Sequence, residues 1–132
     1  MTIRILMVDD EPDAQELFRQ NFRREIREGT YSFDFALSGE AALELLSGRT
    51  PPRVVMVLSD INMPGMSGFE LLAEVRKKWP EVGVFMITAY GDNSTETKVR
   101  ELGAVHFLTK PVDFEALKDE LARTLENGGR SG

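Results

Sequence analysis

The sequence predicts a doubly wound α/β sandwich, a three-layer (βα)5 unit with a parallel five-stranded sheet between two layers of helices. Short apolar runs alternate with segments whose apolar residues recur every three or four positions, as strands do with amphipathic helices. The runs VVMVL at 54–58 and VFMI at 84–87 are apolar without alternation, which indicates strands buried on both faces. Right-handed crossovers then wind the chain over both faces, and we expect the strand order 2-1-3-4-5.

The first half of the chain is predicted to contain three strands and two helices. The strands are expected at 3–8, 31–36 and 54–58. One helix is predicted at 12–28, where a proline suits its first position and a glycine follows its end. The other runs through Ser47 and is capped by Ser38. The residues expected to face inward from these helices are Ala14, Leu17, Phe18, Phe22, Ile26, Ala41, Ala42, Leu45 and Leu46.

The second half is predicted to contain two strands and three helices. Ser67 and Glu70 form a capping-box pattern at the start of a helix that ends before a proline. Asn93 is expected to start the fourth helix, which has only Val99 and Leu102 as large apolar residues. The strands are expected at 83–87 and 104–108, and the last helix at 114–125. The residues expected to be buried under the capping-box helix are Phe69, Leu72, Val75 and Trp79.

Composition limits the classes of function. The chain has 132 residues, which fits one domain at 1–126 followed by a flexible tail at 127–132. Its net charge of -6 argues against direct nucleic-acid binding, which relies on Lys and Arg to neutralise phosphates. It has no cysteine and one histidine, so thiolate and multi-histidine metal sites are excluded. The apolar start of the chain is too short for a signal peptide or a membrane span, so a cytoplasmic protein is expected.

Polar residues follow the predicted strands at one edge of the sheet. The first strand is followed by Asp9 and Asp10, the third by Asp60, the fourth by Thr88 and the fifth by Lys110. In a doubly wound sheet the ligand lies outside the carboxyl ends of the strands. With the first and third strands as neighbours, the three carboxylates converge.

Converging carboxylates repel one another unless a cation neutralises them. A site with only oxygen ligands suits Mg²⁺, which takes one or two carboxylates and shares its remaining positions with water and phosphate oxygens. Lys110 adds a positive charge and Thr88 a hydroxyl donor. Such a site can form an aspartyl phosphate, with Asp60 as the nucleophile. Taken singly, an aspartate after a strand is more often a helix cap or a turn residue; only the joint placement favours the chemical interpretation.

Four motifs in this order and spacing resemble bacterial response-regulator receiver domains of the chemotaxis-regulator type, over residues 3 to about 126. VDDEP at 8–12 is similar to the acidic pair of that family. DINMPGMSG at 60–68 matches its D-x-x-M-P-x-x-x-G pattern, ITA at 87–89 its Thr-Ala step, and LTKP at 108–111 its Lys-Pro step. The resemblance implies a flavodoxin-like fold and phosphorylation-dependent signalling.

The resemblance also implies a metal site and a phosphoacceptor. Asp60 would accept the phosphoryl group. Asp10 and Asp60 would bind Mg²⁺ through their side chains and Asn62 through its backbone carbonyl, while Asp9 would act through water.

Further roles follow from the same resemblance. Thr88 and Lys110 would bind the phosphoryl group, and Thr88 and Phe107 would form the switch. Phe107 stands where many family members have tyrosine, so it has no hydroxyl. The Lys110-Pro111 bond is expected to be cis. We expect Tyr90, two residues beyond Thr88, to shield the acyl phosphate from water.

The implied phosphoryl donor is the phosphohistidine of a sensor histidine kinase or of a histidine phosphotransfer protein. The implied output face comprises the fourth helix, the fifth strand and the fifth helix, which would contact a downstream protein or domain or a second copy of the chain. Met63 and Met66 are expected to contact the kinase rather than the core, although loop methionines can equally fold inward. No membrane contact and no direct nucleic-acid contact are expected.

Three other classes are less consistent with the residues. A haloacid-dehalogenase-type phosphatase would need a second carboxylate two residues after Asp60, where this chain has Asn62, and a cap region. A flavodoxin-like cofactor binder would need a phosphate loop after the first strand, but DDEPD would repel phosphate. A receiver-like interaction module that is never phosphorylated stays open, although the intact set of polar residues disfavours it.

Overall fold

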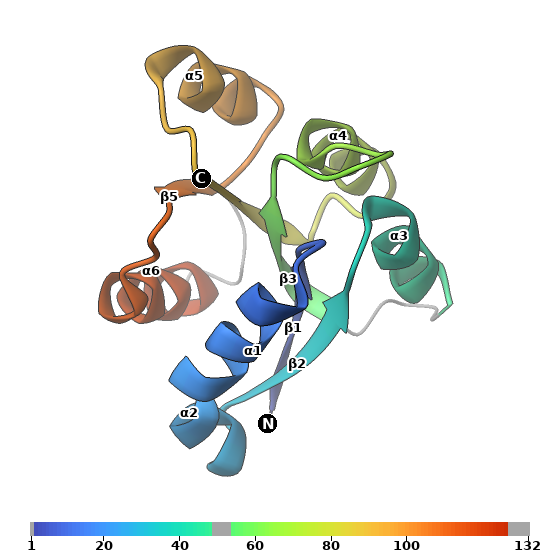
Figure 1. The fold of residues 1–132 in the computed structure, drawn as a ribbon. Coiled ribbons are helices and arrows are strands. Elements are labelled where there is room, and N and C mark those ends of the chain that lie inside the picture. Colours follow the sequence, from blue (N-terminus) through green and yellow to red (C-terminus); the bar gives the residue numbers. More distant parts are fainter. Residues whose placement is uncertain (1, 49–53, 127–132) are drawn as a thin grey trace.

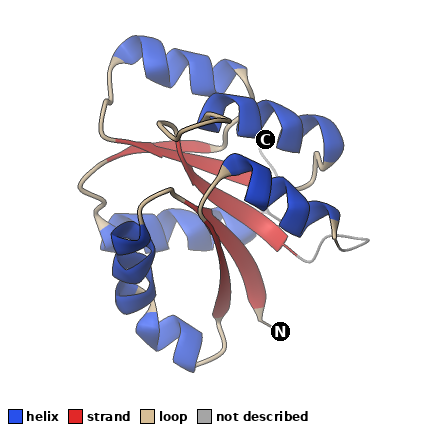
Figure 2. Ribbon diagram, turned by 45° about the vertical axis from the view of Figure 1, so that its right-hand side comes forward, coloured by secondary structure: helices blue, strands red, loops and turns tan. Residues whose placement is uncertain are grey.

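The computed structural model describes residues 2–48 and 54–126, which form a parallel sheet between two layers of helices (Figure 1, Figure 2). The strand order β2-β1-β3-β4-β5 confirms the predicted topology. The strands are β1 (Ile3–Val8), β2 (Tyr31–Ala36), β3 (Val54–Asp60), β4 (Gly83–Thr88) and β5 (His106–Thr109). The helices are α1 (Pro12–Asn21), α2 (Arg23–Arg27), α3 (Gly39–Ser47), α4 (Gly68–Lys78), α5 (Asn93–Glu101) and α6 (Phe114–Glu126). The tail predicted at 127–132 lies outside the described residues.

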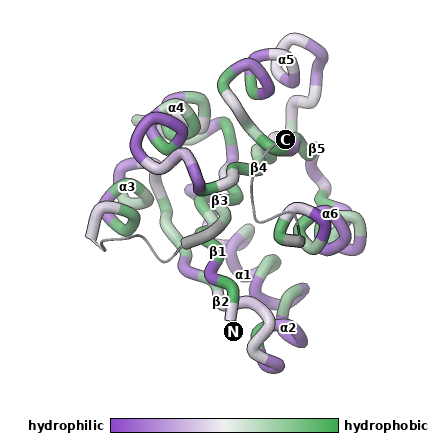
Figure 3. Tube along the Cα trace, turned by 180° about the vertical axis from the view of Figure 1, so that it is seen from behind, coloured by the Kyte–Doolittle hydropathy of each residue, from purple (hydrophilic) through white to green (hydrophobic). Residues whose placement is uncertain are grey.

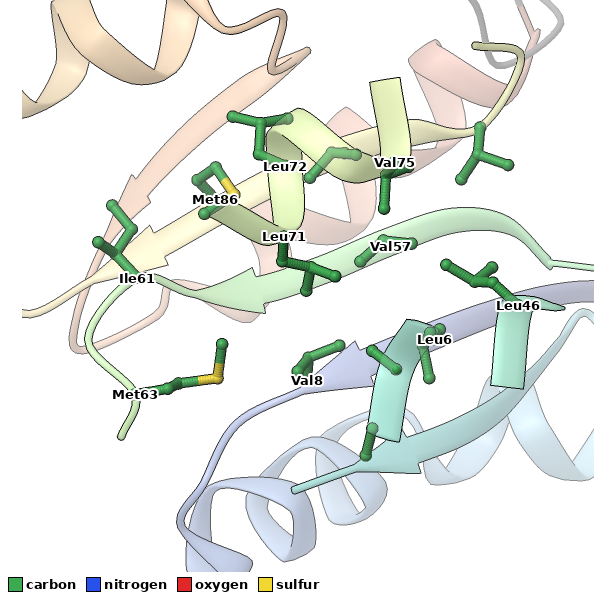
Figure 4. Packing of buried hydrophobic residues seen from close by; sticks show 14 of the residues in the cluster. Leu6, Val8, Leu46, Val57, Ile61, Met63, Leu71, Leu72, Val75 and Met86 are labelled. Carbon is green, nitrogen blue, oxygen red and sulfur yellow. The ribbon is translucent and has the colours of Figure 1, made fainter. Parts of the chain in front are cut away.

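The sheet is buried on both faces because successive residues of its central strands enter different cores. In β1, Leu6 and Val8 pack with residues of α3, α4 and α5, whereas Ile5 and Met7 pack with residues of α1 and α6. Figure 4 shows Leu6 and Val8 in the first of these cores, close to Leu46 and Leu71. Along the trace, hydrophobic residues concentrate on the strands and on the inner sides of the helices (Figure 3). Burial of the sheet on both faces, which was predicted from apolar strands without alternation, is therefore confirmed.

The helix predicted at 12–28 is divided at Phe22, so the prediction of one continuous helix was wrong. Phe22 leaves the helical conformation at φ -103° and ψ 13°, although hydrogen bonds from Phe22 to Phe18 and from Ile26 to Phe22 cross the break. The Phe22 ring is fully buried among other aromatic rings, including that of Phe114 from α6. Because the apolar period continues through the break, the sequence pattern contains no sign of it.

Several details of helix ends and faces also differ from the sequence expectations. α5 begins at Asn93, as predicted, but its cap is Asp92, whose Oδ1 accepts a hydrogen bond of 2.8 Å from the Thr95 amide. Leu17 is 50% exposed and Leu45 43%, so neither faces the core. The predicted caps at Ser38 and Ser67 are confirmed.

Among the described residues, none of the helices combines the length and apolar character that crossing a membrane requires.

Gly68 is the point at which α4 touches the end of β3. A Cβ atom at this position would lie 2.3 Å from the Asp60 carbonyl oxygen and 2.6 Å from the Ile61 Cα, and neither backbone atom can move freely. We therefore expect Gly68→Ala to lower the free energy of unfolding by about 1–3 kcal/mol, the usual cost of overpacking. Urea unfolding measures this change. Gly48→Ala is the matched control and should be nearly neutral, because Gly48 has helical φ and ψ and is exposed.

Candidate functional site

The carboxyl ends of the parallel strands bring the predicted acidic residues together. Asp9 and Asp10 follow β1, and Asp60 is the last residue of the neighbouring β3. One carboxylate oxygen from each of the three lies within 4.8 Å of the others. Asp9 and Asp60 are 0% and 5% exposed, whereas Asp10 is half-buried. The edge thus combines two carboxylates inside the protein with one that reaches the surface.

Lys110 is the cation at the centre of this cluster. It follows β5, and its Nζ lies 3.3 Å from Asp9 Oδ2 and 3.4 Å from Asp60 Oδ2. Its backbone N–H donates to the Thr88 carbonyl at 2.8 Å, which holds the chain after β5 against the end of β4. The Lys110-Pro111 bond is cis, as predicted. Burial lowers the pKa of Lys110, but Asp60 and Asp9 outweigh this effect, so its pKa is raised and the side chain stays charged.

Asp60 is held in an environment that disfavours its charge. Burial raises the pKa of the Asp60 carboxyl above its usual value, and the nearby Asp9 raises it further. Lys110 lowers the pKa of Asp60 but does not fully compensate for burial. A second cation beside the carboxylates would remove this disadvantage.

The donor set fits Mg²⁺. Three carboxylates lie together and one lysine contacts two of them, so two negative charges are uncompensated at close range. Asp9 is already engaged, because its Oδ1 accepts a 2.9 Å hydrogen bond from the Glu11 amide and its Oδ2 contacts Lys110. Within residues 2–48 and 54–126 the Asp10 carboxylate has no hydrogen-bond or ion-pair partner. A hard cation with oxygen ligands is the group that such a cluster accommodates.

Thr88 is buried at the end of β4 with its hydroxyl oxygen already accepting hydrogen bonds. The Tyr90 amide donates to Thr88 Oγ1 at 3.1 Å, and Asn62 Nδ2 lies 3.5 Å from the same oxygen. Phe107 lies on the neighbouring β5, half-buried against the core beneath α3, α4 and α5. The side chain of Tyr90 is 69% exposed. The residues predicted for the switch thus lie on adjacent strands, with Thr88 at the end of β4 and Phe107 opposite Met86.

The loop after β3 differs from its prediction. Met63 is only 8% exposed and belongs to the core, where it points toward Val8 (Figure 4), so the expectation that it contacts a kinase was wrong. The unbranched methionine side chain can turn inward from a loop to fill this space. Met66 packs closely over Gly39, and its amide donates to Glu40 Oε2 at 3.2 Å. The contact with Glu40 had no signal in the sequence.

Gln15 also went unrecognised in the sequence, although a signal existed. Its Nε2 donates to the carbonyl oxygens of Asp9 at 3.3 Å and Ala36 at 3.1 Å. A polar residue stands here on the inner stripe of α1, three and seven positions before Phe18 and Phe22. A glutamine at an inward position indicates that its side chain forms hydrogen bonds with groups inside the protein.

A cavity of about 330 Å³ opens beside Lys110, between α1 and the connection from β5 to α6. Its walls are mostly apolar, and Leu17, half exposed, forms part of them. The lining residues are Met7, Asp9, Glu11, Asp13, Ala14, Leu17, Phe18, Ile87, Lys110, Pro111 and Val112. The cluster of carboxylates therefore borders an apolar surface that another molecule can reach.

Comparisons with known proteins agree with this geometry. Residues 5–122 match the family described as the response regulator receiver domain. Sporulation initiation phosphotransferase F of Bacillus subtilis is 31% identical over 125 residues, which cover 95% of each chain. The response regulator protein PilR of Pseudomonas aeruginosa is 38% identical over 124 residues. That match covers 92% of this chain but 26% of PilR, so the chain spans about a quarter of the length of such relatives.

Solved structures give the same result. The response regulator TrrA of Thermotoga maritima, solved in complex with Mg²⁺ and BeF, is 33% identical with a TM-score of 0.76, covering 92% of this chain and 97% of that one. A CheY-like receiver domain protein of Methanospirillum hungatei covers both chains completely at 25% identity, with a TM-score of 0.87. The chain belongs to the family of response regulator receiver domains, with their flavodoxin-like fold.

Proposed function

We propose that this receiver domain accepts a phosphoryl group on Asp60 in a Mg²⁺-dependent reaction and that the resulting aspartyl phosphate switches one face of the molecule. The observation that carries the proposal is the convergence of Asp9, Asp10 and Asp60, two of which contact Lys110, at the edge where such sheets bind ligands. The phosphoryl donor is the phosphohistidine of a sensor histidine kinase or of a histidine phosphotransfer protein.

In the transfer, a carboxylate oxygen of Asp60 attacks phosphorus while the P–N bond to the donor histidine breaks. The electron pair of that bond leaves with the imidazole, and the product is an acyl phosphate. Lys110 moves from the carboxylates to the phosphoryl oxygens, to which the Thr88 hydroxyl donates a hydrogen bond. When bound, Mg²⁺ neutralises charge on the carboxylates and on the transferring group.

The proposed metal ligands are the side chains of Asp10 and Asp60 and the backbone carbonyl of Asn62. Asp9 acts through water, a role supported by its existing bonds to the Glu11 amide and Lys110. Because the Asp10 carboxylate is half-buried at the surface, it can meet a cation that enters from solvent. Tyr90 is proposed to shield the acyl phosphate, with its exposed ring free to fold over the site.

The switch begins when Thr88 moves toward the phosphoryl group. Its hydroxyl oxygen then leaves the Tyr90 amide and Asn62, and Phe107 can fill the vacated space. α5 is the element suited to shift, because Val99 is its one buried residue. The proposed output face is therefore α5, β5 and α6, the structural counterparts of the predicted fourth helix, fifth strand and fifth helix. The same face could pair two copies of the chain.

The cavity beside Lys110 supports an approach of the donor protein from the side of α1. Leu17 and the cavity walls offer apolar contact next to the acceptor, which suits a partner helix that carries the phosphohistidine. Several relatives that are about four times longer are named transcriptional regulators. An output domain that follows this receiver domain (residues 1–126) is proposed by analogy with them.

Incubation with acetyl phosphate tests the proposal without knowledge of the kinase. In the presence of Mg²⁺ the protein should acquire phosphate that hydroxylamine releases, as expected for an acyl phosphate. With a chelator in place of Mg²⁺, labelling should fall by at least about tenfold, because the carboxylates then repel the phosphoryl group. Absence of labelling under both conditions would favour the alternative of an interaction module that is never phosphorylated.

A further inference from the structure

We infer that Gln15 is a positioning residue for the acidic pair: its side-chain amide fixes the peptide group of Asp9 so that the carboxylates face the Mg²⁺ position. Gln15 has this task only if the edge binds Mg²⁺, so the inference rests on the proposed function. Gln15 itself touches neither the metal position nor the phosphoryl group, and it would act through the backbone of Asp9.

Gln15 ties α1 to the ends of two strands at once. Its Nε2 donates to the Asp9 carbonyl at 3.3 Å and to the Ala36 carbonyl at 3.1 Å. The Asp9 amide donates to the same Ala36 carbonyl at 3.1 Å. Asp9 is thereby held on both sides, at its N–H by β2 and at its C=O by α1. Gln15 is half-buried, so water competes only partly for these bonds.

The connection from β1 to α1 needs such a restraint because it carries the acidic pair. β1 ends at Val8, so Asp9 and Asp10 lie beyond the strand. Their carboxylates lie within 4.8 Å of that of Asp60, a repulsive arrangement that Lys110 offsets only in part. The side chain of Asp9 accepts from the Glu11 amide at 2.9 Å, a bond that depends on where the Asp9 peptide sits. A donor that fixes this peptide therefore holds the direction of the carboxylate.

Groups that orient metal ligands affect metal affinity more than stability. Loss of an outer-shell partner typically weakens metal binding by about 10–100-fold. Gln15 binds a backbone carbonyl rather than a ligand atom, so we expect the lower end of that range. Gln15→Leu keeps the size of the side chain and removes both donors.

The test is calorimetric titration of Mg²⁺ into the wild type, Gln15→Leu and the control Gln20→Leu, which changes an exposed residue of the same helix. Gln15→Leu should raise the Kd for Mg²⁺ about tenfold, while Gln20→Leu stays within about twofold of the wild type. Without metal, amide hydrogen exchange of Glu11 should be faster in Gln15→Leu. With acetyl phosphate, the half-saturating Mg²⁺ concentration should rise while the maximal labelling rate is unchanged.

The possible outcomes separate the two ideas. If the wild type binds Mg²⁺ and Gln15→Leu binds it equally well, Gln15 has only a structural role and the inference is wrong, whatever happens to stability. If Gln20→Leu weakens Mg²⁺ binding as much as Gln15→Leu, the effect does not come from the bonds of Gln15 and the inference is again wrong. If the wild type itself binds no Mg²⁺, the proposed function fails first.

Discussion

Asp60→Asn should abolish labelling by acetyl phosphate, with a loss of more than about 10³-fold, because an amide oxygen cannot replace the attacking carboxylate. The substitution conserves size at a position that is 5% exposed, so the fold should persist. Phosphate incorporation measured at saturating Mg²⁺ gives the result. Asp34→Asn is the matched control, since it alters a carboxylate on β2 that pairs with Arg4 and should label normally.

The same variant has an expected effect on stability with a definite sign. Burial raises the pKa of Asp60, so the folded protein without metal is destabilised once the carboxyl ionises. The contribution of this group to stability is fully present below its unfolded pKa and is lost as pH rises through the raised folded pKa. Asp60→Asn should therefore be more stable than the wild type at neutral pH without Mg²⁺. The difference should disappear in acid. A variant that is both unlabelled and unfolded would leave the role of Asp60 unsupported.

Lys110→Met should lower the labelling rate by about 100-fold at saturating Mg²⁺, because it removes a charged donor aimed at the place where phosphoryl charge develops. It should also shift the pH dependence. Lys110 lowers the pKa of Asp60, so its removal raises that pKa further and moves the acid limb of the rate profile to higher pH. Initial labelling rates across a pH series measure both effects.

Lys118→Met serves as the control for Lys110→Met. Lys118 pairs with Glu25 at 3.2 Å, in a contact between α6 and α2 that involves none of the strand-end carboxylates. Its loss should leave both the labelling rate and the pH profile unchanged. An equal loss of labelling in the two variants would mean that a general change of charge or stability, rather than the position of Lys110, explains the effect.

The fold was predictable because its signals are long and repeated. Apolar strands without alternation, such as the one at 84–87, specify burial on both faces, and the whole of β4 is buried. Capping residues in the sequence located the helix starts, as at Ser67, where the structure has the predicted capping box. The start of α5 was also located at Asn93, where the adjacent Asp92 supplies the cap.

The sequence predicted which residues of the candidate site lie together, because the carboxyl ends of parallel strands share one edge of the sheet. How they meet depends on tertiary contacts that periodicity does not encode. Met63 turns into the core because an unbranched side chain fills space beneath the loop, whereas the sequence left both positions open and favoured the surface. The contact between Glu40 and Met66 joins residues 26 positions apart and has no local signature. Gln15 did carry a signal, a polar residue on an apolar stripe.

The most direct test of the central claim is the position of the label. After incubation with acetyl phosphate and Mg²⁺, the phosphoaspartate can be trapped by reduction with borohydride and located by peptide mass spectrometry. The account predicts modification at Asp60, dependent on Mg²⁺ and absent from Asp60→Asn. Labelling at another residue, such as His106 or Asp10, or labelling that persists in Asp60→Asn, would contradict it.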